Sequence, residues 1–431
     1  MKSKTLLLLF LAPLTLASSL SADTFTWDGG DSSNNAWGAA LNWADNTIAF
    51  GNTVDIVYDG GADTASNFLG NNRTIRSLTY TSLPGAHVMN MAANGGVSRD
   101  LTFEADSGNS TVTIDPNSLI TWAEGSTFDA NGDADVILNS DLDIVHNGTG
   151  VFRINTEFVD GTAGDAVTIE STSTGIVELR PGNGNPANSS GSSFTGGLEF
   201  KDGSVRVFMS DTNGASGALS TGDLTFSGTA AADATLIVGT NGSVLTETIA
   251  NNIVLNNGGG TVSVGNASAN ATFSGAISGT GDLRKTGNGD ITLSGTNTFT
   301  GDINNQNSGT IFLASDGSLT FDIDASGVNN GFIGANTSSL NLDGIFNFDL
   351  TGAGTGLSDQ WTIIAGVLMT NTTFGSNFRV AGFTETADVW TNGAGTYQFS
   401  ETTGMLSVIP EPSSAVAGLL LAAGMMRRRR E

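Results

Sequence analysis

The residues best suited to bind a metal lie in the segment that reads DANGDAD. Its oxygen-bearing side chains recur at every second residue, as in a calcium-binding loop, and they are Asp129, Asn131, Asp133 and Asp135. The segment lacks the glycine at the sixth position and the carboxylate at the twelfth, where Ser140 stands. Asn, Asp and Gly are also the ordinary residues of tight turns. We therefore expect a turn here and no cofactor, with calcium binding by these four residues as the alternative.

Side chains for acid–base or nucleophilic catalysis form no recognisable set. The chain has no cysteine and two histidines, His87 and His146, in ordinary strand and turn contexts. With 42 acidic residues, a close pair such as Asp141 and Asp143 is expected by chance. A second calcium-like stretch, GNGDITL at 287–293, has its Gly-to-Asp spacing one residue short of a β-roll repeat. We predict no catalytic residues.

The N-terminus has the three parts of a secretory signal. Lys2 and Lys4 form a charged end, an apolar run follows from Thr5 to Leu16, and small residues come next. The apolar run is short for the roughly 20 residues that span a bilayer. We predict a signal peptide over 1–22. Small residues permit cleavage anywhere from Ala17 to Ala22, and we favour cleavage after Ala22.

The C-terminal residues 409–431 read as a second targeting segment. Pro410, Glu411 and Pro412 force an extended, exposed backbone, because proline cannot continue a strand or a helix. An apolar run from Ala415 to Met426 follows, and the chain then places four cations that would remain on the cytoplasmic side and halt export: Arg427, Arg428, Arg429 and Arg430. As a helix, this run would cover only about 18 Å of a hydrocarbon core of roughly 30 Å. It suits a transient anchor better than a permanent one.

Charge limits the partners of the region between these ends. The two ends hold 6 of the 16 basic residues, so 10 basic residues face 40 acidic ones between 23 and 410, a balance of about −30. Like charges repel, and few cations are available to neutralise phosphates or uronates. This composition argues against nucleic acids and acidic polysaccharides as tight partners.

The elements that would position any site are short strands. Runs of alternating Val, Ile, Leu and Thr end at Gly, Asn, Asp or Ser, as in TIRSLTY (74–80), STVTI (110–114) and GTVSV (260–264). No long amphipathic helix is evident between 23 and 400. Strands of this kind predict an all-β sandwich, barrel or solenoid. Two similar stretches, beginning at Ser190 and Ser294, favour the solenoid, in which each unit buries its apolar face on the next.

One stretch, 248–303, resembles the autotransporter-associated β-strand repeat. The matching motifs are Lys-Thr-Gly-x-Gly (285–289), Leu-Ser-Gly (293–295) and Asn-Thr-Phe-Thr-Gly (297–301). The opening TFTWDGGDSSNNAWGAALNWADN also looks like the first segment of such proteins, with Trp27, Trp37 and Trp43 at its core. The resemblance implies a right-handed parallel β-helix over 23–330. The chain leaves no room for the outer-membrane barrel of true autotransporters, so their self-export is not implied.

From 331 to 408 the sequence carries more aromatic residues, including Trp361, Trp390 and Tyr397. An aromatic-rich terminal piece suits a β cap over the open end of a solenoid, where a bare edge would template aggregation. A separate small β-sandwich is the alternative.

The tail resembles the PEP-CTERM sorting signal of Gram-negative bacteria. That resemblance implies export, transient anchoring in the inner membrane as a short hydrophobic helix, and processing near Pro410–Pro412 by an exosortase, a membrane cysteine protease. The protein would then reach the cell surface, outer membrane or extracellular matrix.

The family resemblance links such proteins to exopolysaccharide and to biofilm or floc formation. We therefore expect a structural or adhesive protein with extracellular polysaccharide as a candidate partner, beside the export machinery and the exosortase. Two alternatives stay open. A β-helix lyase or hydrolase would need clustered carboxylates with a basic residue, and a glycan-binding module would carry exposed aromatic side chains on one face.

Overall fold

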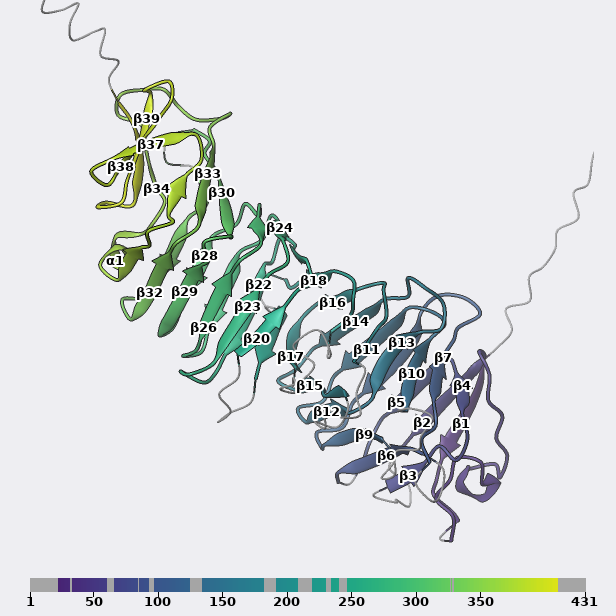
Figure 1. Ribbon diagram of the computed structural model, residues 1–431. Coiled ribbons are helices and arrows are strands. Elements are labelled where there is room, and N and C mark those ends of the chain that lie inside the picture. Colours follow the sequence, from purple (N-terminus) through teal and green to yellow (C-terminus); the bar gives the residue numbers. More distant parts are fainter. Residues whose placement is uncertain are drawn as a thin grey trace, which may run out of the picture.

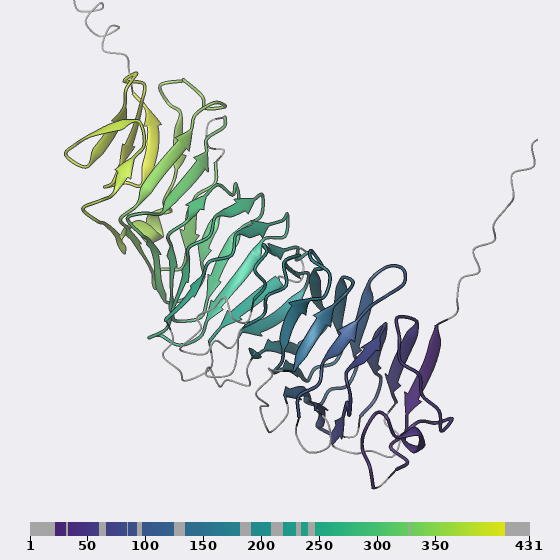
Figure 2. The same cartoon turned by 45° about the vertical axis from the view of Figure 1, so that its right-hand side comes forward.

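The computed structural model describes residues 22–31, 33–59, 66–83, 85–92, 97–124, 134–181, 191–207, 219–229, 234–239, 246–325, 327 and 329–409. These residues form a parallel β-helix: successive coils stack into an elongated rod, with an antiparallel sheet at its C-terminal end (Figure 1, Figure 2). The predicted signal peptide and tail lie outside the described residues, apart from Ala22 and Ile409.

Two long parallel sheets run along the rod. Sheet 1 consists, in spatial order, of β1 (Asp23–Trp27), β2 (Val54–Tyr58), β5 (Ser77–Tyr80), β8 (Ser110–Ile114), β11 (Leu142–His146), β14 (Val167–Ser171), β16 (Leu198–Phe200), β18 (Leu224–Phe226), β21 (Ile253–Leu255) and β24 (Ile277–Gly279). Sheet 2 consists of β3 (Ser66–Phe68), β6 (His87–Met91), β9 (Ile120–Glu124), β12 (Val151–Ile154), β15 (Ile176–Leu179), β17 (Gly203–Val207), β19 (Ala234–Val238), β22 (Gly260–Val264), β25 (Leu283–Thr286), β28 (Ile303–Asn305) and β31 (Phe332–Gly334).

Three shorter parallel sheets complete the coils. Sheet 3 holds β4 (Arg73–Ile75), β7 (Leu101–Phe103), β10 (Asp135–Leu138) and β13 (Glu157–Asp160). Sheet 4 holds β20 (Thr246–Ile249), β23 (Asn270–Phe273), β26 (Asp290–Leu293), β29 (Gly309–Leu313), β32 (Ser338–Leu342) and β35 (Thr372–Phe374). Sheet 5 holds β27 (Thr296–Asn297), β30 (Ser318–Asp322), β33 (Ile345–Asp349) and β36 (Arg379–Val380).

Within many strands, buried residues alternate with partly exposed ones, and this alternation sets the register in which neighbouring coils pair. In β2 the first, third and fifth residues, Val54, Ile56 and Tyr58, are buried, while the two residues between them are partly exposed. Each inward side chain stacks on its partner in the next coil, and one such row of sheet 1 consists of Ile56, Leu78, Val112, Ile144, Ile169, Phe200, Phe226 and Leu255. The expected all-β solenoid is confirmed. Its core is a set of such rows running along the rod.

One predicted strand is divided in the structure. The run TIRSLTY was expected to form a single strand, but Thr74 and Ile75 belong to β4 in sheet 3, whereas residues from Ser77 belong to β5 in sheet 1. The chain turns a corner at Arg76, whose guanidinium pairs with Asp55 on the neighbouring strand. A corner can fall within an apolar run because both flanking strands bury alternate residues in the same core.

Glycines allow the coils to approach one another at other corners. A Cβ on Gly295 would overlap the carbonyl oxygen of Gly275 in the preceding coil, and one on Gly275 would overlap the carbonyl oxygen of Asn251. Only a residue without a side chain fits this spacing without displacing the neighbouring backbone. The Leu-Ser-Gly motif therefore marks a position where backbones of consecutive coils stack directly.

The N-terminal end is covered by a tryptophan cluster formed by the last residue of β1 and by the segment around the short 3-10 helix η1 (Ala40–Asn42). Trp27, Trp37 and Trp43 are all buried, and Trp43 meets the other two edge to face. The indole N–H of Trp37 donates to the Tyr58 hydroxyl at 2.7 Å. The Trp43 indole N–H donates to the Trp37 carbonyl at 2.8 Å, so the cluster closes the first coil with apolar surface while these two indole donors stay paired.

The C-terminal end carries sheet 6, which is antiparallel. It consists, in spatial order, of β34 (Gln360–Thr362), β40 (Met405–Val408), β39 (Tyr397–Ser400), β38 (Val389–Asn392) and β37 (Phe383–Thr386), and the one-turn helix α1 (Gly366–Met369) follows β34 in the chain. Phe399 of this sheet packs against Phe346 of the last coils with ring centroids 5.8 Å apart. The sheet is therefore a cap on the rod, as expected, rather than a separate sandwich.

The change of architecture lies later than the change of composition at 331. Parallel pairing continues through β31, β32, β33, β35 and β36, so the coils extend to Val380. The added aromatic residues serve both the last coils and the sheet on top of them. Among the described residues, no helix is long and apolar enough to cross a membrane.

Candidate functional site

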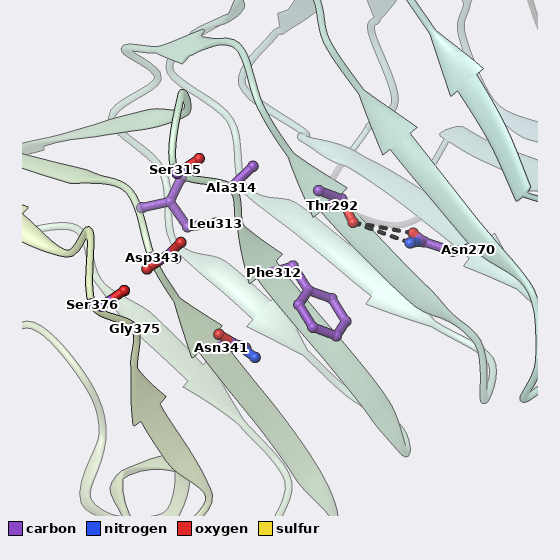
Figure 3. A pocket seen from close by; sticks show the side chains of 10 residues that line it. All are labelled: Asn270, Thr292, Phe312, Leu313, Ala314, Ser315, Asn341, Asp343, Gly375 and Ser376. Atoms are coloured by element: carbon purple, nitrogen blue, oxygen red, sulfur yellow. Dashed lines mark hydrogen bonds between the residues drawn. The ribbon is translucent and has the colours of Figure 1, made fainter.

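A hollow of about 500 Å³ lies on the outward face of sheet 4 (Figure 3). Strands β23, β26, β29 and β32 contribute Asn270, Thr292, Phe312 and Asn341 to it, and Asp343 follows β32 directly. The side chains come from consecutive coils, so the site depends on the stacking of the solenoid rather than on one local motif.

Phe312 forms the apolar part of this hollow. It is half-buried on the outward side of β29, between Ile311 and Leu313, which point into the core. Register places Thr292 beside it on one side and Asn341 on the other. An aromatic ring in an outward row otherwise made of polar residues offers a flat apolar surface surrounded by hydrogen-bonding groups.

The polar groups of the hollow are amides, hydroxyls and one carboxylate. The Thr292 hydroxyl accepts from the Asn270 amide N–H and donates to the Asn270 amide oxygen, each at 3.2 Å. The carboxylate of Asp343 accepts hydrogen bonds from the backbone and side-chain N–H groups of Asn377 at 2.8 and 2.9 Å, and these bonds hold its pKa below the usual range. The described lining includes no lysine, arginine or histidine. The site therefore suits a ligand that donates hydrogen bonds and carries no negative charge.

This set of groups does not match the chemistry of a glycosidase or lyase. A glycosidase uses two carboxylates flanking the bond to be cut, and the described lining of the hollow holds one. Asp343 is held by its two bonds from Asn377 rather than aimed at a second acid. The arrangement can bind and orient a ligand.

A second hollow, of about 410 Å³, lies between two turns nearer the N-terminus. The segments 81–83 and 115–118 line it, and the carboxylate of Asp115 accepts a hydrogen bond from Asn147 at 2.8 Å. Its described lining has no aromatic residue. It lacks the stacking surface that Phe312 supplies in the first hollow.

The two histidines lie inside the rod. His87 is 3% exposed and packs against the stacked rings of Tyr58 and Tyr80, with centroids 5.2 and 5.8 Å away. Burial lowers its pKa to about 4, and burial likewise lowers the pKa of His146. Both are core residues, and they belong to sheets 2 and 1, in coils well before those that form the hollow on sheet 4.

Asp129, Asn131 and Asp133 lie outside the described residues, so the calcium alternative concerns Asp135 alone in this structure. Asp135 opens β10 and pairs in register with Glu157. Among the described residues, no group of three or more His, Cys, Asp or Glu side chains is arranged to hold a metal ion.

The other acidic residues noted in the sequence join one coil to the next. The carboxylate of Asp141 accepts a hydrogen bond from the backbone N–H of Ala166, and that of Asp143 accepts one from the Asn109 side chain. Asp290, in the β-roll-like stretch, accepts a bond from the Thr310 N–H at 2.7 Å. Each of these contacts links neighbouring coils.

Two motif residues of the repeat prove to be buried polar groups. Lys285 is fully buried, and its ammonium donates to the carbonyl oxygens of Gly287 and Ser308 at 3.0 and 2.8 Å, while burial lowers its pKa to about 8. The Asn297 amide donates to Gly295 and Ser318 carbonyls and accepts from the Ile277 N–H. These side chains satisfy backbone groups at corners where the sheet ladder is interrupted.

The sorting-motif residues Pro410, Glu411 and Pro412 and the arginines 427–430 lie outside the described residues. Ala22, the predicted cleavage position, directly precedes β1. No protein-family model matches the chain, and the searches of curated proteins and of solved structures likewise give no match.

The hollow around Phe312 was not predicted from the sequence. The signal available was the strand GTIFL, in which Ile311 and Leu313 occupy the inward positions and leave a phenylalanine facing outward. That pattern identifies an outward-facing ring. Its polar neighbours could not be found, because Thr292 and Asn341 are 20 and 29 residues away and are aligned only by coil stacking.

Proposed function

We propose that this protein is an exported structural or adhesive rod of the bacterial surface or extracellular matrix, sorted through its C-terminal tail. The observation that carries the proposal is the rod itself, whose rows of buried side chains run through coil after coil from β2 to β36. A stack of this kind gives a long, stiff surface built from similar short units, each of which contacts only its neighbours. Extended surfaces suit attachment to polymers rather than turnover of small substrates.

The ends of the fold support the proposed processing. Cleavage after Ala22 would leave Asp23 as the first residue, and the Asp23 nitrogen, which donates to the Thr53 carbonyl at 3.0 Å, could still donate as an ammonium group. At the other end β40 finishes at Val408, two residues before Pro410. Loss of both targeting segments would therefore remove no described strand.

The proposed partners are the export machinery, an exosortase-type protease of the inner membrane, and extracellular polysaccharide. The tail resembles the PEP-CTERM signal in its Pro-Glu-Pro, its apolar run and its arginines. Its short apolar run favours transient association with the inner membrane, because it covers little more than half of a hydrocarbon core. The acidic balance of the body disfavours nucleic acid.

Deleting Arg427–Arg430 is expected to change where the protein accumulates in the producing bacterium. Without the cations the tail loses its stop-transfer signal, so the protein should pass into the periplasm or medium with its apolar tail still attached. Fractionation with immunoblotting measures the distribution. A variant with all four arginines replaced by lysine keeps the charge and should behave like the wild type. Unchanged distribution of the deletion variant would contradict the sorting role.

A structural role also predicts that the protein turns over no polysaccharide. Mature protein incubated with a panel of neutral and acidic polysaccharides should release no reducing ends and no unsaturated products. Detectable turnover would replace the structural proposal with the β-helix lyase or hydrolase alternative.

A further inference from the structure

We propose that the outward face of sheet 4 binds a neutral polysaccharide chain, with one sugar ring stacked on Phe312. The inference rests on the proposed function, since it names the polymer class that the rod would hold and the place where it holds it. Its evidence is the hollow on β23, β26, β29 and β32, and no part of it depends on the tail.

The ring of Phe312 gives the hollow an aromatic face on which a sugar ring can stack. A pyranose ring has one face made mainly of C–H groups, which packs against an aromatic face with both apolar burial and attraction to its quadrupole. Phe312 is half-buried, so its ring is fixed by the strand while part of it remains open to the hollow. Outward positions on a solenoid are ordinarily polar, because they face water. Phe312 lies against the hollow in an outward row whose other members are polar, so its ring provides the flat apolar surface of that hollow.

The polar groups of the hollow match the hydroxyl groups of an uncharged sugar. Each side-chain amide, such as that of Asn270 or Asn341, can both donate and accept, as a sugar hydroxyl can, and Thr292 and Ser315 add hydroxyls. The Asp343 carboxylate accepts only, and two bonds from Asn377 keep it ionised. It would repel a uronate or a phosphate. The described lining offers no cation to offset that repulsion, so the fitting polymer is uncharged.

The direction of the chain follows from the register. Thr272, Thr292, Phe312, Asn341 and Thr373 form one row across five strands, perpendicular to the strands and along the rod. Neighbouring strands are about 4.8 Å apart, which is roughly the length of one sugar unit in an extended polymer. A chain lying along the rod would therefore meet one coil per sugar, with the ring at Phe312 in the middle of the row.

The test uses the mature protein recovered from its producing cells and uncharged hexasaccharides of glucose, mannose, galactose and xylose. Isothermal titration calorimetry should show binding of at least one of them, and Phe312→Ala should weaken that binding at least tenfold. Phe312→Trp should keep it, because the larger ring preserves the stacking surface. Ile333→Ala is the matched control, since Ile333 is 37% exposed on the outward side of β31 in the adjoining sheet 2, and it should leave binding unchanged.

Three results would overturn the inference. They are a wild-type protein that binds none of the four hexasaccharides, equal losses in the Phe312→Ala and Ile333→Ala variants, or equal binding of hexagalacturonate. Circular dichroism of each variant establishes that it is folded. Failure here is distinguishable from failure of the proposed function: a protein that is processed and present on the surface but binds no sugar refutes only this site. A protein that binds sugar yet never leaves the cell refutes the proposed function.

Discussion

Replacing Asn297 with leucine is expected to lower the free energy of unfolding of the surrounding coils by about 4 kcal/mol. The Asn297 side chain is 1% exposed and connects three coils: its amide donates to Gly295 and Ser318 at 3.0 Å each and accepts from the Ile277 N–H at 3.1 Å. Leucine has a similar volume but no polar atom. It would leave the buried Ile277 N–H without its partner, which costs about 1–3 kcal/mol. It would also remove one bond each from the Gly295 and Ser318 carbonyls, worth about 0.5–1.5 kcal/mol apiece, although the Gly295 carbonyl still accepts from the Ser318 N–H at 3.0 Å.

Hydrogen exchange followed by mass spectrometry measures this effect locally. Peptides covering β24, β27 and β30 should exchange much faster in Asn297→Leu than in the wild type, and peptides of the N-terminal coils should change less, because a solenoid loses stability near the altered interface first. Asn288→Leu is the matched control, since Asn288 is exposed on the same coil. Equal exchange in Asn297→Leu and wild type would show that the corner bonds contribute nothing.

Acidification from pH 6.5 to pH 4 is expected to destabilise the N-terminal coils by about 3 kcal/mol through His87 alone. Burial against Tyr58 and Tyr80 lowers its pKa from 6.5 to about 4 in the folded chain. In that window the unfolded chain binds a proton that the folded chain does not bind, so stability falls as the pH falls. Above pH 6.5 both states are neutral at this residue and its effect is absent.

Urea unfolding followed by tryptophan fluorescence at several pH values tests this prediction. The variant His87→Phe keeps an aromatic ring in the core but cannot be protonated, so the pH dependence between 6.5 and 4 should be smaller by about 3 kcal/mol. The wild type must be compared with His87→Phe, because other groups also change stability as the pH falls. Burial lowers the pKa of His146, which adds to the loss of stability in acid, and raises the pKa of Asp302, which opposes that loss. The same pH dependence in both proteins would show that His87 is not buried in its neutral form.

The architecture could be predicted from the sequence because its cause is local. Buried and partly exposed residues alternate within many strands, as in Val54–Tyr58 and Ser110–Ile114, and the turn residues between strands break the pattern visibly. The repeat motifs around Lys285 and Asn297 supported stacking of similar units. The hydrogen bonds of these two side chains could not be predicted from the motifs, because some of the carbonyl groups they bind, those of Ser308 and Ser318, belong to the next coil.

The candidate site could not be predicted in the same way, because coil length varies. Asn270 pairs with Asp290, 20 residues later, whereas Ser77 pairs with Thr111, 34 residues later. Insertions at the corners shift the register between distant segments without changing the alternation within any strand. Phe312 could therefore be recognised as an outward-facing residue, but its neighbours Thr292 and Asn341 could not. The same variation placed a corner at Arg76 inside what read as one strand.

The most direct test of the account is the intact mass of the protein recovered from outside the producing cell. Export with processing at both ends predicts a chain that begins at Asp23 and ends at or near Pro410–Pro412, so that the described fold is present and both targeting segments are gone. A chain recovered from the outer membrane or the medium that still ends in Arg427–Arg430 and Glu431 would contradict the account.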